Sequence, residues 1–251
     1  MKSKFPNATG SASPRPADVP SDPAQNTLGV RIADIAALRA DGSIVIGQRK
    51  IPSMPLFDEA FSAFAHGTNL QSDKGPIAIE DLQPGDRLLT AEGGSSEISW
   101  IGSSTFMPSD KGNFTPLTRI MADSFGVSRP DSFLSLGPAA RLLQTPAHLR
   151  SEVGEKRVFT PARAFVDGVN VIEVTPPTPI RMFHVCLQRH AAVIAGGLEI
   201  ETYHPGANPL RLLSHTLRTV FMSVFPQISH VSDFGPMNYA RASVEDDLTA
   251  A

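Results

Sequence analysis

The sequence predicts an all-β protein with one amphipathic helix near its C-terminal end. Between residues 67 and 206, short apolar runs such as PIAI, RLLT, EISWIG and NVIEV are separated by clusters of Gly, Pro, Asp and Ser, a pattern typical of short strands joined by turns. After residue 206 the apolar residues recur at three- and four-residue steps, which indicates a helix. Charged residues make up 19% of the chain, below the roughly 25% of an average domain. This argues against a bundle of solvated helices.

Two segments precede the β-rich region. Residues 1–27 are rich in Pro, Ser, Ala, Asn and Asp, and we expect them to be disordered because they bury too little apolar surface. Residues 28–60 form a short lead-in module. Within it, VRIADIAAL has helix-like apolar spacing, and SIVIGQ is predicted to be a strand after the turn at Asp41-Gly42.

The main domain is expected over residues 61–206, and the C-terminal helix and tail over 207–251. The alternating run at 86–90, a Gly-rich turn and the run at 97–101 predict a β-hairpin. The TPPTP stretch at 175–179 is not expected inside a central strand, because proline has no N–H donor. The helix is predicted over 210–225, and its apolar face carries five residues, which are Leu213, Leu217, Val220, Phe221 and Val224.

The stretch GTNLQSDKGPIAIEDLQPGDRLLT, which begins at Gly67, carries the strongest motif. Its core, IEDLQPGD, has the sequence of a strand end, a turn through Pro84-Gly85 and a returning strand. The order and spacing of the whole block resemble the opening of a Hedgehog/intein (Hint) domain, a self-processing fold with bacterial members. The resemblance implies two β subdomains with long curved hairpins, related by a pseudo-two-fold axis.

The resemblance also identifies an unusual residue. In that family the block usually begins Cys-x-x-x-Gly-Thr, whereas the same six positions here read AFAHGT and begin at Ala63. Ser62 stands one residue before the nucleophile position. Because a slip of one residue reverses the face of a strand side chain, Ser62 is not expected to replace the cysteine.

Two later blocks resemble the rest of the family's site. Thr145-Pro146-Ala147-His148 is similar to its Thr-x-x-His block, which implies that His148 and Thr145 polarise the scissile peptide. His190 matches a late-block histidine, and Tyr203-His204 matches the aromatic-His step that precedes a terminal asparagine. That asparagine position holds Pro205, which has no side-chain amide to cyclise.

Three functions follow from these residues. The first is a degenerate Hint scaffold without autoprocessing, in which Thr145, His148, His190 and His204 are vestiges of a site. The second is active self-cleavage by an N-to-O acyl shift through Ser62. The third is a β-fold binding module unrelated to processing. If the His148 side of the site is intact, the substitution Ala63→Cys is expected to restore partial thiol-sensitive cleavage.

The single cysteine and the histidines also have simpler interpretations. Cys186 lies in an apolar strand and is more typical of a small buried side chain than of a nucleophile. His184, His190 and His204 lack the close spacing of a zinc site, so no metal or other cofactor is expected.

Charge and composition limit the partners. The net charge of −3, with acids and bases interspersed, gives no electrostatic footprint for nucleic acid or anionic lipid. The N-terminal residues lack the apolar run of a secretory signal, and no run approaches the ~18 apolar residues of a membrane span. We expect a soluble, cytoplasmic monomer, with an unidentified protein as its possible partner.

Overall fold

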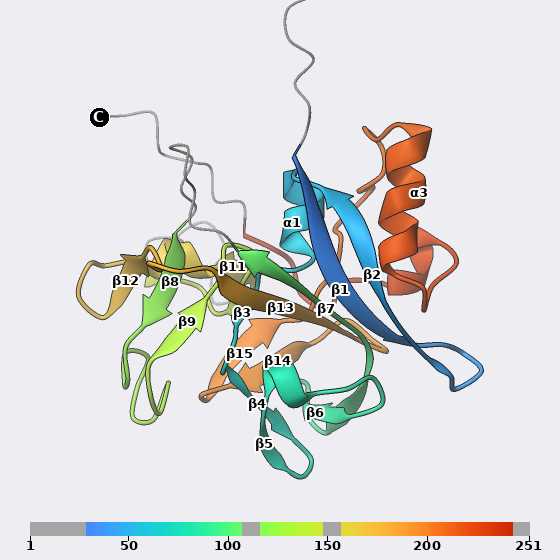
Figure 1. Ribbon diagram of the computed structural model, residues 1–251. Coiled ribbons are helices and arrows are strands. Elements are labelled where there is room, and N and C mark those ends of the chain that lie inside the picture. Colours follow the sequence, from blue (N-terminus) through green and yellow to red (C-terminus); the bar gives the residue numbers. More distant parts are fainter. Residues whose placement is uncertain (1–28, 107–115, 148–156, 243–251) are drawn as a thin grey trace, which may run out of the picture.

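The computed structural model describes residues 29–106, 116–147 and 157–242. The expected disorder of residues 1–27 lies outside this part of the chain, as does His148. Strands are the main regular structure among the described residues, which confirms the predicted all-β class (Figure 1).

A long central strand organises the sheet. β7 (Ser95–Phe106) pairs along one edge with β13 (Ile180–Leu187) and along the other with β1 (Val30–Leu38). Its first residues pair instead with β6 (Arg87–Leu89), which confirms the hairpin predicted from the two runs around the Gly-rich turn. β7 therefore joins the lead-in module, the opening block and the closing block of the chain.

The remaining strands extend this sheet on both sides. Beyond β6 the order continues through β4 (Asn69–Ser72), β14 (Ala192–Ala195), β15 (Leu198–Glu201), β10 (Arg141–Leu143) and β11 (Phe159–Pro161). Beyond β13 it continues through β3 (Phe64–Ala65), β9 (Leu134–Leu136), β8 (Leu117–Ile120) and β12 (Val171–Val174), while β5 (Gly75–Ala78) pairs with β4. As predicted, residues 175–179 lie between strands, because β12 ends at Val174 and β13 begins at Ile180.

The predicted helix over 30–38 is wrong. These residues form β1, which pairs along its full length with β2 (Ile44–Pro52). Burial alternates along the strand, with Ala33, Ile35 and Ala37 inside and Val30 and Ile32 exposed. The true period is therefore two, and pairing with both β2 and β7 outweighs the helical propensity of the alanines.

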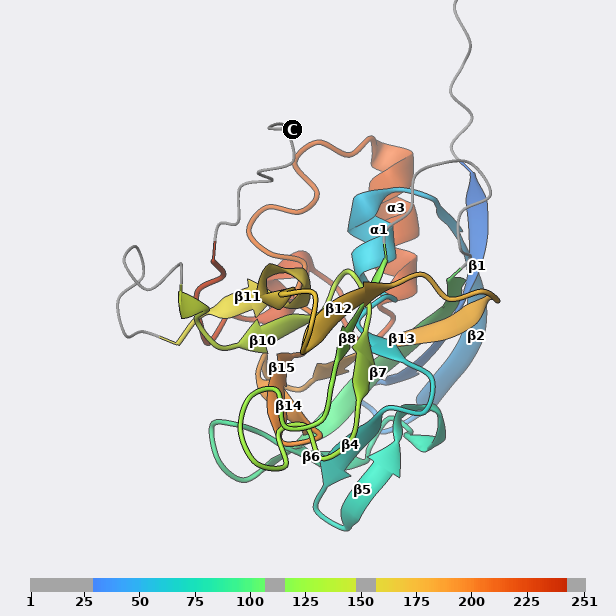
Figure 2. The same cartoon turned by 90° about the vertical axis from the view of Figure 1, so that its left-hand side faces the viewer.

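The C-terminal helix is confirmed, although it is shorter than predicted. α3 (His215–Val224) begins five residues late because Ser214 caps it, accepting a hydrogen bond from the backbone N–H of Leu217 at 3.3 Å. Its predicted apolar face points inward, with Phe221 and Val224 fully buried. α3 lies beside α1 (Pro55–Glu59), against β1 and β2 (Figures 1 and 2), and the ring centroids of Phe57 and Phe221 are 5.9 Å apart.

The two flanks of the chain thus share one core. Phe57 and Phe61 from the N-terminal side meet Phe221 and Phe225 from the C-terminal side around Trp100 of β7. The indole N–H of this tryptophan donates to the carbonyl of Val224 at 2.8 Å. A second apolar cluster fills the rest of the sheet around Phe64, Leu136 and Val185.

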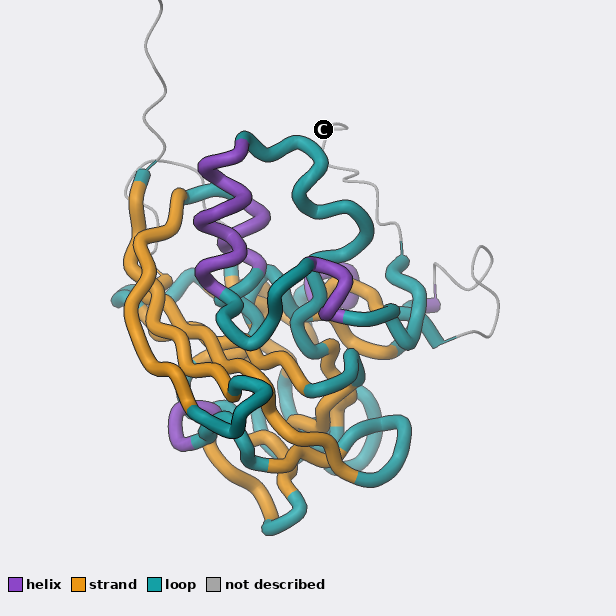
Figure 3. The backbone as a smooth tube through the Cα atoms, turned by 90° about the vertical axis from the view of Figure 1, so that its right-hand side faces the viewer, coloured by secondary structure: helices purple, strands orange, loops and turns teal. Residues whose placement is uncertain are grey.

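Short helical turns complete the structure. They are η1 (Ile79–Asp81), η3 (Ala162–Phe165) and η4 (Val231–Phe234). The chain after α3 runs as a loop through η4 (Figure 3) and returns to β11, where Phe159 and Arg241 form an isolated bridge. No helix among the described residues is long and apolar enough to cross a membrane.

Candidate functional site

Ala63 lies in the core just before β3. Its side chain is fully buried in the apolar cluster around Phe64, and its backbone N–H donates to the carbonyl of Phe183 on β13 at 3.0 Å. Its carbonyl accepts a hydrogen bond from the N–H of Gly137 at 2.8 Å. Both backbone groups of this residue are therefore occupied, and its methyl group offers no lone pair.

Ser62 is also buried and engaged. Its hydroxyl donates to the carbonyl of Asp58 at 2.8 Å. A backbone carbonyl cannot accept the proton in an acyl shift, so this contact does not activate the hydroxyl. The carbonyl of Ser62 accepts a hydrogen bond from the N–H of Ala139 at 3.1 Å.

The loop Gly137–Ala140 therefore faces the peptide bond between Ser62 and Ala63. Sequence reasoning missed this loop, although the Gly137-Pro138 pair directly after the run at 134–136 is a turn signal. Its four residues are Gly, Pro, Ala and Ala, so none of its side chains can donate or accept a proton. The backbone N–H of Ala139 polarises the Ser62 carbonyl, and this is the contact that the loop supplies.

The predicted Thr145–His148 block is only partly described. Thr145 lies two residues after the end of β10 and is half-buried, whereas His148 lies outside the described residues. The role of this block stays a prediction.

The structure brings His190 and His204 together. Their ring centroids are 5.1 Å apart with the rings nearly perpendicular, and both side chains are buried. Nδ1 of His190 accepts a hydrogen bond from the backbone N–H of Asn238 at 3.2 Å, which leaves the Nε2–H to donate to Glu201 at 3.0 Å. Sequence reasoning missed Glu201, although it lies between the two histidines in the chain, and Asn238, which comes from a distant part of the chain.

His204 has the same donor arrangement. Its Nδ1 accepts a hydrogen bond from the N–H of Gly206 at 3.0 Å, and its Nε2–H donates to the carbonyl of Gly235 at 3.0 Å. Burial lowers the pKa of His204 below its ordinary value, and the neighbouring His190 lowers it further. The His204 carbonyl, which precedes Pro205, accepts a hydrogen bond from Arg241 at 2.7 Å.

Glu201 is the charged centre of this cluster. Arg241 donates to its two oxygens at 2.9 and 3.2 Å, and Arg141 lies 3.8 Å away. Burial alone would raise the pKa of Glu201, but the hydrogen bond from His190 and the two guanidinium charges outweigh it and lower the pKa. The carboxylate is thus held ionised by its partners.

His184 connects this cluster to the Ala63 end. Its Nδ1 lies 2.9 Å from the carbonyl of Glu59, and its Nε2 lies 3.5 Å from that of Glu201. Burial lowers the pKa of His184 to about 4. Along the same strand, Phe183 accepts a hydrogen bond from Ala63, and Val185 accepts one from Tyr203 at 2.8 Å. The two ends of the resemblance therefore meet on β13.

Cys186 is buried on β13 as a free thiol, and burial raises its pKa above the ordinary value. This environment disfavours the thiolate that nucleophilic chemistry needs. Among the described ranges, no three His, Cys, Asp or Glu side chains are grouped so that they could hold a metal ion.

Comparison with known proteins gives one family. The Hint domain model matches residues 62–207, more than half of the chain. The chain is similar to a bacterial intein-like domain from Clostridium thermocellum, at 12% identity over 57% of this chain and 99% of that one, with a TM-score of 0.38. It is also similar to a DnaB intein from Synechocystis, at 13% identity over 57% and 99%, with a TM-score of 0.31. No curated protein matches.

Proposed function

This chain belongs to the Hint domain family, and on that premise we propose that it is a Hint scaffold that neither cleaves nor splices itself. The main support for the proposal is the identity and the burial of residue 63. The family's nucleophile position holds an alanine that is buried without exposure among apolar side chains. Acyl transfer from the preceding carbonyl needs an attacking oxygen or sulfur there.

The surroundings of the Ser62–Ala63 peptide support the same conclusion. The N–H of Ala139 still donates to the Ser62 carbonyl, as an electrophile-stabilising group would. However, the leaving nitrogen of Ala63 donates to the carbonyl of Phe183, and no side chain of the loop Gly137–Ala140 can protonate it. In this proposal the backbone part of a processing site remains, and the loop Gly137–Ala140 adds no side-chain chemistry to it.

A second group that the family's chemistry uses is missing at the C-terminal end of the Hint domain. Pro205 follows His204 where a cyclising asparagine would stand, and a proline ring has no amide nitrogen for the attack. The His190–His204 pair then has a structural role. Glu201 and Asn238 occupy the ring nitrogens of His190, and the backbones of Gly235 and Gly206 occupy those of His204.

The remaining alternative is self-cleavage through Ser62. Against it stands the hydrogen bond from its hydroxyl to the carbonyl of Asp58, a group that cannot act as a base. The match to the Hint domain family argues against the third alternative, a binding module unrelated to Hint proteins.

A scaffold of this kind acts by binding. With acids and bases interspersed and a net charge of −3, it suits a protein partner better than nucleic acid. The free thiol of Cys186 is compatible with a reducing cytoplasm, where the chain would act as a monomer.

A hydroxylamine trap tests the proposal. An N-to-O shift at Ser62 would produce an ester between its hydroxyl and the carbonyl of Phe61, which hydroxylamine cleaves at that junction. The wild-type chain and Ser62→Ala are incubated with hydroxylamine and analysed under denaturing conditions, because the shared core would hold native fragments together. We expect no fragments from either protein. Fragments from the wild type that are absent from Ser62→Ala would overturn the proposal.

A further inference from the structure

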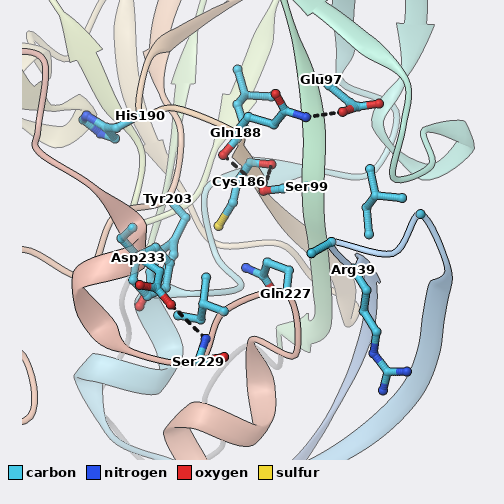
Figure 4. Close-up of a pocket in the computed structure, with 16 residues that line it drawn as sticks. Arg39, Glu97, Ser99, Cys186, Gln188, His190, Tyr203, Gln227, Ser229 and Asp233 are labelled. Carbon is cyan, nitrogen blue, oxygen red and sulfur yellow. Dashed lines mark hydrogen bonds between the residues drawn. The ribbon is translucent and has the colours of Figure 1, made fainter.

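A cavity of about 830 Å³ lies between the Hint domain and the flanks of the chain. One wall comes from β7 and the end of β13, including Ser99 and Cys186, and the opposite wall comes from the turn after β1 and from residues 227–234 (Figure 4). It is separate from the Ser62–Ala63 peptide, none of whose residues lines it.

Apolar and polar side chains share the wall. The apolar ones include Leu38, Leu187, Ile228 and Phe234. Figure 4 shows the sulfur of Cys186 pointing into the space between Tyr203 and Gln227. The volume lies within the roughly 300–1,000 Å³ that is usual for pockets binding small organic molecules.

Two buried polar atoms in this wall have no hydrogen-bond partner among the described residues. They are the hydroxyl of Tyr203, a residue only 4% exposed, and the side-chain oxygen of Gln227. A buried polar group without a partner destabilises a fold, so each such group calls for an explanation. A ligand that accepts a hydrogen bond from the tyrosine and donates one to the glutamine would satisfy both.

The acidic and guanidinium side chains of the wall either have a hydrogen-bond partner or point away from Cys186 and Tyr203. Glu97 accepts a hydrogen bond from Gln188, and Asp233 accepts from the backbone N–H groups of Ser229 and His230 at 2.9 Å. The guanidinium of Arg39 extends away from Cys186 and Tyr203 (Figure 4). A charged ligand would therefore lose its hydration without gaining an ion pair, which selects for an uncharged one.

We infer that this cavity binds a small uncharged ring compound carrying a carbonyl and an N–H group, the chemistry of a cyclic amide. The Tyr203 hydroxyl donates to the carbonyl, and the Gln227 oxygen accepts from the N–H. The apolar side chains, with the Cys186 thiol, contact the ring. His190 of the histidine cluster also lines the cavity, but binding of such a ligand needs no self-processing chemistry.

Titration calorimetry with two probes tests this inference. The first probe is quinolin-2(1H)-one, and the second is its N-methyl derivative, which keeps the carbonyl and lacks the N–H. We expect one saturable site for the first probe and binding about tenfold weaker for the second, since a tenfold change corresponds to the ~1.4 kcal/mol of one hydrogen bond. Absence of saturable binding of quinolin-2(1H)-one, or equal affinity of the two probes, would overturn the inference.

Two substitutions locate the site. Tyr203→Phe removes the hydroxyl but keeps the ring stacked on Phe225 at a centroid distance of 5.1 Å, and Gln227→Leu removes the acceptor. Each is expected to weaken binding of quinolin-2(1H)-one about tenfold. Gln71→Leu on β4, outside the cavity wall, is the matched control and should bind like the wild type. Unchanged affinity in both cavity variants, with the fluorescence of Trp100 confirming their folds, would contradict this assignment.

Discussion

The backbone N–H of Gly137 donates to the carbonyl of Ala63 at 2.8 Å. This bond holds the turn after β9 against the residue that the sequence resemblance aligns with the family's nucleophile. A second bond, from the N–H of Ala139 to the carbonyl of Ser62 at 3.1 Å, completes the contact. The Ser62–Ala63 peptide is thus held by backbone groups, and no side chain of the loop Gly137–Ala140 can donate or accept a proton.

The first prediction concerns Gly137 itself. A Cβ atom at this residue would lie 2.0 Å from the carbonyl oxygen of Ser62, a backbone atom that cannot move without displacing β3. Gly137→Ala should therefore lower the free energy of unfolding by about 3 kcal/mol, at the upper end of overpacking effects. Urea denaturation followed by the fluorescence of Trp100 measures it.

Gly47→Ala on β2 is the matched control. There the added Cβ would meet only the end of the flexible Arg49 side chain, at 3.0 Å. Its unfolding free energy should stay within about 0.5 kcal/mol of the wild type, as for most surface substitutions. Equal losses in the two variants would show that the turn does not grip the Ser62 carbonyl.

The second prediction concerns Ala63→Cys. The new thiol would reach the Ser62 carbonyl, but the loop Gly137–Ala140 has no acid to protonate the leaving nitrogen. Because the described residues provide only the Phe183 carbonyl at this nitrogen, we expect no fragments after incubation with dithiothreitol at neutral pH, measured by denaturing electrophoresis. The partial cleavage expected from the sequence requires His148 to reach the nitrogen. Cleavage between residues 62 and 63 would instead show that an acid such as His148 reaches the leaving nitrogen.

The third prediction concerns the charged cluster. Glu201→Gln would leave Arg241 and Arg141 near a neutral amide in a buried site. The free energy of unfolding should fall by about 3 kcal/mol, as when one partner of a buried ion pair is removed. Glu199→Gln, on the same strand but paired with Arg157 near the surface, should cost less than about 1 kcal/mol. Similar losses in the two variants would mean that Glu201 does not organise the cluster.

The fourth prediction is a pH dependence that originates in His184. Its pKa is about 4 in the folded state, below the ordinary 6.5, so the unfolded chain binds more protons between these values. Stability should therefore fall as the pH drops from 6.5 to 4, by on the order of 3 kcal/mol from this residue. Burial also lowers the pKa of His204, which adds a smaller effect of the same sign.

Urea denaturation at several pH values checks this assignment. His184→Gln should flatten the stability profile between pH 4 and 6.5, because the amide does not titrate. His66→Gln, at an exposed histidine, is the comparison variant and should keep the dependence that originates in His184. A wild-type slope retained in His184→Gln would assign the dependence to other groups.

Much of the fold follows from local sequence. The hairpin at 86–101, the break at 175–179 and the buried face of α3 each depend on short patterns, and the structure has all three. The strand β1 could not be predicted in this way, because its mixture of Ala and Ile fits both the helical period and the strand period. Only its pairing with β2 and β7, across distant parts of the chain, makes it a strand.

The site was less accessible to sequence reasoning. His190 and His204 could be chosen from the family resemblance, and the structure brings their rings together. Asn238 and Arg241 could not, because they lie beyond the matched residues and reach the histidines only after the chain has looped back past α3. The loop Gly137–Ala140 has no functional side chain, so nothing but its backbone contacts reveals it.

The most direct test of a non-processing Hint scaffold is the intact mass of the wild-type chain during synthesis and storage. Samples are denatured at once after expression and again after several days at neutral pH, and their masses are measured by mass spectrometry. The account predicts one species at the full mass of the 251 residues at every time. Accumulation of two complementary fragments that join at residues 61 and 62, at 62 and 63, or at 204 and 205 would contradict it.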